Sequence, residues 1–242
     1  MLLTFFLINS VQGQFDIYSA SKNGDLELVK KLLTADSSLL NIRDSYGMTP
    51  LHYASAKSIE VVAYLVGKGA DVNIPSNDET TPLYTAARFW QTKIVQYLLE
   101  HNANVNARSL GGAPIHQAAY RPSTDMVVIF LAYKADLSIT DTFGQTPIHI
   151  AASYDADSVL IMLITAGGNI NTKDKEGNTP LHSSLKFYDY DSTGISKSAL
   201  ILIKNSALLN QRNKEGLTPL GMAIRMEATN MIRVLTEAGA IK

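Results

Sequence analysis

The sequence predicts an all-α fold, a solenoid of about seven stacked helix-turn-helix repeats with finger turns between them. A six-residue motif of the type Thr-Pro-Leu-His-x-Ala occurs six times, beginning at residues 49, 81, 113, 146, 179 and 218. The intervals between successive motifs are therefore 32, 32, 33, 33 and 39 residues. A second block, seen as Gly69-Ala70-Asp71-Val72-Asn73, keeps the same period. A period held over most of a chain is typical of a repeat array and not of one conventional core.

Each motif predicts the start of a short helix. Thr at the N-cap can accept a hydrogen bond from an unpaired backbone N–H, and Pro at the first helical position gives up only an N–H that would be unpaired there. Apolar runs such as residues 59–66 and 94–99 predict the second helix of each repeat. Asp44 followed by Gly47 indicates the turn that leads to the next motif. One such helix pair cannot bury its apolar face alone, so neighbouring pairs must stack.

These motifs resemble the ankyrin repeat family, whose Thr-Pro-Leu-His-x-Ala pattern and 33-residue period the chain reproduces. The resemblance extends from about Phe15 to the C-terminus, and its first unit lacks Thr-Pro, as capping repeats often do. The repeat domain is expected to span residues 14–242, with units at 14–43, 44–75, 76–107, 108–140, 141–173, 174–212 and 213–242. The resemblance implies reversible protein binding without chemistry of its own.

Three repeats depart from the family pattern. Glu79 stands where neighbouring finger turns carry glycine, so this turn either avoids a positive φ or is strained. Ala113 replaces the capping Thr of its repeat, a loss that typically costs about 1 kcal/mol. The 39-residue interval places extra residues between the two helices of the sixth repeat, and insertions of this kind often lie on the binding face.

The inserted stretch raises the alternative of a calcium-dependent binding module. Asp189, Asp191 and Thr193-Gly194 have the spacing that opens an EF-hand loop. The bidentate Glu of such a loop would fall at position 200, which is Leu200. We therefore favour a solvated turn and expect neither a metal nor a cofactor.

Four of the five histidines, His52, His116, His149 and His182, belong to the motif itself. The family resemblance implies that these imidazoles form hydrogen bonds around the Thr-Pro turns and tie neighbouring fingers together. Copies stacked about 10 Å apart could not share one zinc ion held at about 2 Å. The chain also lacks a Gly-rich phosphate loop, Gly-x-Ser-x-Gly and His-Glu-x-x-His. We therefore expect no catalytic residues and no enzyme activity.

The composition excludes several classes of partner. The 21 Lys and Arg nearly balance the 22 Asp and Glu, so no global field attracts nucleic acid. The absence of cysteine excludes disulfides and thiolate metal sites. With 46% apolar residues, the chain is too apolar to be expected to be disordered. We expect a folded monomer without a transmembrane segment.

In ankyrin proteins, partners usually contact the finger turns and the first-helix surface on the concave side. The residues two and three positions beyond each motif Ala form a column, which we call the helix-end column; six of its seven pairs contain a basic residue and four contain an aromatic. Arg beside Phe or Tyr is enriched in interface hot spots. The predicted partner-binding residues are Tyr46, Lys57, Arg88, Phe89, Trp90, Tyr120, Arg121, Phe143, Tyr154, Lys186 and Phe187. We expect them to hold an unknown protein through a segment of acidic and apolar character.

Two alternative interpretations of this column remain open. Basic side chains near the C-terminus of a helix also complement its dipole, which would explain the charge but not the aromatics. Trp90 occupies an interhelical turn position that such repeats usually give to glycine, and it could pack over a neighbouring helix instead of contacting a partner.

Residues 1–13 belong to no repeat and contain an apolar stretch from Leu2 to Ile8. Val11 and Gly13 would fit signal-peptidase cleavage before Gln14, and the stretch is too short to span a bilayer. The segment lacks the basic residues of a typical signal, so a hydrophobic flap over the first repeat is the alternative. We favour an export signal and a secreted or periplasmic protein; an uncleaved N-terminus would favour a cytoplasmic scaffold or effector.

Overall fold

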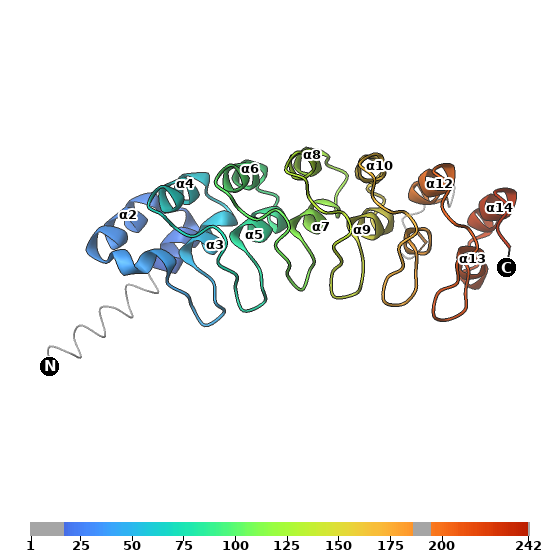
Figure 1. Ribbon diagram of the computed structural model, residues 1–242, viewed down its shortest axis with the longest axis horizontal. Helices are drawn as coiled ribbons and strands as arrows, with labels where there is room; N and C mark the ends of the chain where they lie inside the picture. Colours follow the sequence, from blue (N-terminus) through green and yellow to red (C-terminus); the bar gives the residue numbers. More distant parts are fainter. Residues whose placement is uncertain (1–16, 186–194, 242) are drawn as a thin grey trace. The chain divides into compact units, whose positions relative to one another are not determined.

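The computed structural model describes residues 17–185 and 195–241, which form stacked helix pairs joined by finger turns (Figure 1). The predicted all-α fold class is confirmed, and seven helix pairs follow one another along this described part of the chain. The chain divides into two compact units, one ending at Leu110 and the other beginning at Gly111. Each unit has its own stacked helices and its own buried core.

The first unit contains three helix pairs. Residues 17–23 are helical and precede α2 (Leu26–Ala35), which a 3-10 helix, η1 (Ser37–Asn41), follows. The next pairs are α3 (Pro50–Ser55) with α4 (Ile59–Gly67), and α5 (Pro82–Arg88) with α6 (Thr92–Glu100). First helices stack on first helices and second on second, because α3 contacts α5 and α4 contacts both α2 and α6. The layers enclose fully buried side chains, among them Val29, Leu51, Leu65, Leu83 and Leu98.

The second unit contains four pairs. They are α7 (Pro114–Ala118) with α8 (Asp125–Ala132), α9 (Pro147–Ser153) with α10 (Asp157–Thr165), α11 (Pro180–Ser183) with α12 (Lys197–Lys204), and α13 (Pro219–Arg225) with α14 (Thr229–Glu237). The insertion separates α11 from α12, and Asp189, Asp191 and Thr193 lie outside the described residues. Leu200 lies within α12 and is 42% exposed, so the position of the expected calcium-binding Glu is a helical residue without a side-chain oxygen.

The predicted helix starts are confirmed at the Thr-Pro positions. The Thr49 and Thr81 hydroxyls accept hydrogen bonds from the backbone N–H groups three residues ahead, and Pro follows each at the first helical position. Ala113 has no side-chain acceptor, so α7 begins without this bond. The bond from the N-cap backbone to the motif histidine is kept, because His116 Nδ1 accepts from the Ala113 N–H at 3.0 Å, as His52 Nδ1 accepts from the Thr49 N–H.

Each motif histidine joins its own helix start to the finger turn of the next repeat. His52 Nδ1 accepts from the Thr49 N–H at 3.0 Å, so the ring proton must lie on Nε2. Nε2 then donates to the Thr80 carbonyl at 2.9 Å, across 28 residues of sequence. The predicted structural role of this histidine is confirmed.

The same bond repeats within the second unit. His116, His149 and His182 donate from Nε2 to the carbonyls of Gln145, Asn178 and Leu217 at 3.1 to 3.2 Å. All three rings are almost fully buried, and burial lowers the pKa of His116 below its usual value. A neutral ring is therefore the form that this fold requires.

A second ladder of hydrogen bonds, which the sequence did not reveal, uses asparagine. An Asn ends the second sequence block of several repeats, the block seen as residues 69–73. Its side-chain oxygen accepts a hydrogen bond from a backbone N–H of the corresponding block in the next repeat. The pairs are Asn41 with Asp71, Asn73 with Asn104, Asn171 with Leu208, and Asn210 with Ile241, at 2.8 to 3.1 Å. The recurring Asn of the second block thus connects repeats within each unit.

Glu79 and Trp90 are two of the seven described non-glycine residues that have a positive φ. Glu79 has a φ of 60° and Trp90 a φ of 59°, both in the left-handed region that favours glycine. The equivalent finger position in the second unit is Gly144, with a φ of 77°. Of the two outcomes expected for Glu79, the strained one is correct.

Glycine at position 79 should relieve this strain. We expect Glu79→Gly to raise the free energy of unfolding by about 1 kcal/mol, measured by urea unfolding at pH 7. Asp78→Gly is the matched control, because Asp78 is exposed and has no positive φ, so glycine there only adds freedom to the unfolded chain. A Glu79→Gly protein no more stable than Asp78→Gly would contradict a strained turn.

The histidine bonds should make the fold sensitive to acid. Burial lowers the pKa of His52 from 6.5 to about 4. Between these values the unfolded chain binds a proton that the folded chain does not, so stability falls as the pH drops from 6.5 towards 4. The difference corresponds to about 3 kcal/mol. Urea unfolding at several pH values should show a smaller acid loss for His52→Gln than for the wild type; equal losses would contradict the lowered pKa.

Candidate partner-binding surfaces

The finger turns hold aromatic side chains in solvent on a fixed backbone. Asp44 Oδ1 accepts the N–H groups of Tyr46 and Met48, each at 2.9 Å, and the Tyr46 side chain is 72% exposed. The Tyr46 carbonyl in turn accepts the Asn77 N–H of the next finger at 2.9 Å. The backbone of the tip is therefore bonded within its own turn and to its neighbour while the ring remains free to contact a partner.

The second unit builds an equivalent tip. Asp141 Oδ1 accepts the N–H groups of Phe143 and Gln145, and the Phe143 carbonyl accepts the Lys175 N–H at 2.9 Å. The Phe143 side chain is 69% exposed. Both predicted finger aromatics thus lie in solvent.

In the first unit, two of the predicted partner-binding residues line one shallow pocket. Lys57, which follows α3, and Trp90, which follows α5, line a hollow of about 270 Å³. Trp90 is half-buried, while Arg88 is exposed and Phe89 is 52% exposed. Trp90 therefore lies at the start of α6 and also lines a surface open to solvent.

In the second unit, Tyr120 and Tyr154 come together from successive repeats. Their ring centroids are 4.8 Å apart with planes at 71°, an edge-to-face arrangement. Tyr154 and Arg121 are exposed and Tyr120 is half-buried. Lys186 and Phe187 lie outside the described residues. The single face predicted to be centred on Arg88 and Tyr120 includes residues of both units, and its continuity stays a prediction.

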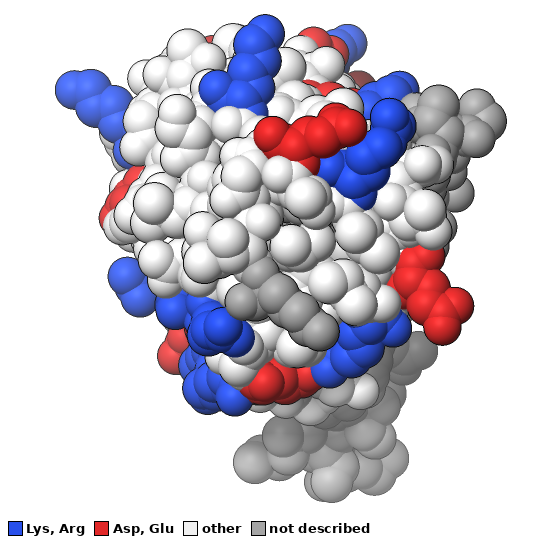
Figure 2. All heavy atoms as spheres, turned by 90° about the vertical axis from the view of Figure 1, so that its right-hand side faces the viewer, with Lys and Arg blue, Asp and Glu red and all other residues white. Residues whose placement is uncertain are grey.

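The basic character of the column is weaker at its C-terminal end. Arg225 forms an ion pair with Glu215 of the adjacent finger, and both side chains are more than half exposed. Figure 2 shows a face on which Lys and Arg lie beside Asp and Glu, without a large patch of one sign. The predicted preference for acidic partners therefore depends on Lys57, Arg88 and Arg121.

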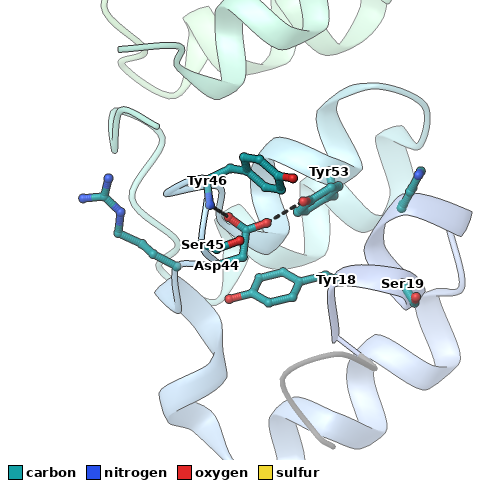
Figure 3. Close-up of a pocket in the computed structure, with 8 residues that line it drawn as sticks. Tyr18, Ser19, Asp44, Ser45, Tyr46 and Tyr53 are labelled. Atoms are coloured by element: carbon teal, nitrogen blue, oxygen red, sulfur yellow. Dashed lines mark hydrogen bonds between the residues drawn. The ribbon is translucent and has the colours of Figure 1, made fainter. Parts of the chain in front are cut away.

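A pocket around Asp44 in the first unit was not predicted (Figure 3). The Tyr53 hydroxyl donates to Asp44 Oδ2 at 2.5 Å, and the rings of Tyr53 and Tyr18 have centroids 5.6 Å apart. Burial, and secondarily the Asp44 charge, raises the pKa of Tyr18 to about 12. The only signal in the sequence was that Tyr53 fills the variable position of its motif.

Sequence reasoning also missed an apolar column on the second helices of the second unit. Val128, Ile161 and Leu200 occupy corresponding positions of α8, α10 and α12, and they are 50%, 50% and 42% exposed. The corresponding residue of α14 is Arg233. Three consecutive repeats therefore expose an apolar side chain where a charged one would also fit.

Within residues 17–185 and 195–241, no group of three or more His, Cys, Asp or Glu side chains could hold a metal ion. No helix in the same residues is long and apolar enough to cross a bilayer.

Comparison with known proteins agrees with this architecture. A family model described as ankyrin repeats in three copies matches residues 17–109 and 115–193, more than half of the chain. The palmitoyltransferase AKR1 of Lachancea kluyveri is 31% identical over 133 residues, which cover 50% of this chain and 18% of that protein.

Other relatives are similarly partial. The ankyrin repeat protein nuc-2 of Neurospora crassa is 30% identical over 131 residues, covering 53% of this chain and 12% of the relative. Inversin of Gallus gallus is 29% identical over 122 residues, covering 50% of this chain and 11% of the relative. The chain thus matches less than a fifth of the length of each of these three proteins.

Proposed function

This chain belongs to the ankyrin repeat family, and we propose that it is a non-enzymatic module that binds a protein segment of acidic and apolar character. Ankyrin repeats are protein–protein interaction modules, and their fold is generally non-catalytic. The proposed binding residues in the first unit are Tyr46, Lys57, Arg88, Phe89 and Trp90. Those in the second unit are Tyr120, Arg121, Phe143 and Tyr154.

The observation that supports this proposal most strongly is the pairing of exposed rings with an ordered backbone. Tyr46 and Phe143 project from finger turns whose N–H and C=O groups are hydrogen-bonded within and between repeats. Aromatic side chains have few rotatable bonds and bury a large area on contact. A partner would therefore bind them with a small loss of conformational entropy.

The charge of the column supports an acidic partner. Lys57 and Arg88 are exposed in the first unit. Arg88 is the last residue of α5 and also complements the helix dipole, a role that leaves its guanidinium accessible. Complementary charges across an interface accelerate association and fix orientation.

We propose export as the setting in which this binding occurs. The support comes from residues 1–13, whose structure is outside the described residues. The mass of the intact protein purified from its native source should correspond to a chain that begins at Gln14. A mass that includes Met1 would contradict cleavage and would favour the alternative, a cytoplasmic scaffold or effector.

A capture experiment tests the binding surface. Immobilised wild-type chain and Arg88→Glu/Phe89→Ala are compared for proteins retained from extracts of the native source. We expect the double variant to lose specific partners, because the charge reverses and the exposed ring is removed. Both changed side chains are exposed, so urea unfolding should show stabilities within about 0.5 kcal/mol of each other.

Ile161→Ser is the matched control on a second helix of the second unit. It removes an equally exposed apolar side chain from the column on α10, and should retain the same partners as the wild type. Partners kept by Arg88→Glu/Phe89→Ala but lost by Ile161→Ser would contradict the proposed surface and assign binding to the second helices.

A further inference from the structure

The pocket around Asp44 is distinct from the proposed binding surface, although it shares Tyr46 with that surface and Lys22 with the helix-end column. It lies in the first unit between residues 18–22, the finger turn 43–46 and α3, and has a volume of about 480 Å³. We propose that this pocket binds the guanidinium group of an arginine side chain on a protein partner. The site would recognise a charge opposite to that expected for the Arg88 surface, so failure of one proposal leaves the other intact.

Asp44 has hydrogen-bond capacity that its own turn does not use. A carboxylate can accept about four hydrogen bonds. Oδ1 accepts two, from the Tyr46 and Met48 N–H groups, and Oδ2 accepts one, from the Tyr53 hydroxyl. Oδ2 therefore keeps one position for a donor in the pocket, and a charged N–H donor is the kind that a carboxylate binds most strongly.

Aromatic side chains surround this carboxylate. Figure 3 shows Tyr18, Tyr46 and Tyr53 on different sides of Asp44, contributed by the helix at residues 17–23, the finger turn and α3. A cation within about 6 Å of an aromatic face is attracted by the negative potential of the ring. Tyrosine faces and a carboxylate therefore favour the same kind of ligand.

The charge of the carboxylate also acts on the neighbouring tyrosine hydroxyls. Among the described side chains, Asp44 is the charged one that contributes to the raised pKa of Tyr18, and its charge acts in the same direction on the pKa of Tyr53. Lys22 and Arg43 also line the pocket, and Lys22 is exposed. Arg43 Nε already donates to the Gly47 carbonyl at 3.2 Å, which ties this guanidinium to the finger backbone. The Asp44 charge thus acts on both tyrosine hydroxyls, in a pocket that these two cations also line.

Guanidinium suits this pocket better than ammonium. It is planar, stacks on aromatic faces and is more weakly hydrated, so it loses less on entering a pocket lined by rings. Its several N–H donors also allow one to reach Oδ2 while the plane remains against a tyrosine.

Titration with small probes tests the proposal while the partner is unidentified. The full chain is titrated with Nα-acetylarginine amide while backbone amide shifts are followed by NMR. We expect saturable shifts at Tyr46 and Gly47. Nα-acetylcitrulline amide, which has nearly the same shape without the charge, should bind about tenfold more weakly, and the lysine analogue should also bind more weakly than arginine.

Asp44→Asn removes the charge without removing the turn. Asn213 shows that asparagine supports the same geometry, because its Oδ1 accepts the Glu215 and Leu217 N–H groups in the last finger. We expect Asp44→Asn to weaken arginine binding about tenfold. Asp141→Asn makes the same change in a finger of the second unit and should have no effect on binding.

The change in probe affinity in Lys22→Gln distinguishes a pocket that binds cations from one that binds anions. Removing this positive charge should strengthen the binding of the arginine probe. The proposal would be overturned if citrulline bound as well as arginine, or if no saturable shift appeared at Tyr46 and Gly47. It would also be overturned if Nα-acetylglutamate amide bound more tightly than arginine and lost affinity in Lys22→Gln, because the pocket would then take an anion.

Discussion

The hydrogen bond from a motif histidine to the carbonyl of the next finger is the interaction that holds four of the finger turns in the described residues. Because the backbone N–H of the N-cap residue donates to Nδ1, the proton must lie on Nε2, and Nε2 has only the next repeat to donate to. The ring is buried in the process, so it must be neutral. One side chain thereby caps a helix, fixes its own tautomer and positions a turn that lies 28 to 35 residues further along the chain.

This constraint links the fold to the proposed binding role. The finger of Phe143 is held by His116, by its own Asp141 and by the backbone of the next finger, so it can present a large ring to solvent without losing its shape. The finger of Tyr46 is held by its own Asp44 and by the backbone of the next finger. Tyr46 is both an exposed finger tip and one wall of the Asp44 pocket. In these proposals the first unit carries two sites, one around Arg88 for an acidic segment and one around Asp44 for a guanidinium, although the net charge of the whole chain is only −1.

Much of the fold could be predicted because its determinants are local and periodic. Thr49 and Pro50 encode a helix start by themselves, and His52 recurs at a spacing that indicates its structural role. The Asp44 pocket could not be predicted, because Tyr18, Asp44 and Tyr53 meet only after two repeats have stacked. The asparagine ladder could not be predicted for the same reason. In the sequence Asn73 is typical of a turn residue, and its bond to the Asn104 N–H forms only when the next repeat lies beside it. The conformation of Glu79 was undecided because the neighbouring finger, and not residue 79 alone, sets the turn: the Asn77 N–H bonds to Tyr46.

Neutral Nε2–H histidines connect the repeats, and the most direct measurement of this state is imidazole ¹⁵N NMR of the folded chain at pH 7. We predict protonated Nε2 and unprotonated Nδ1 for His52, His116, His149 and His182. His101 is an internal reference, because its Nδ1 lies 2.8 Å from the Tyr97 carbonyl and must carry a proton there. The role of these histidines would be contradicted if the four rings carried their proton on Nδ1, or carried two protons at this pH.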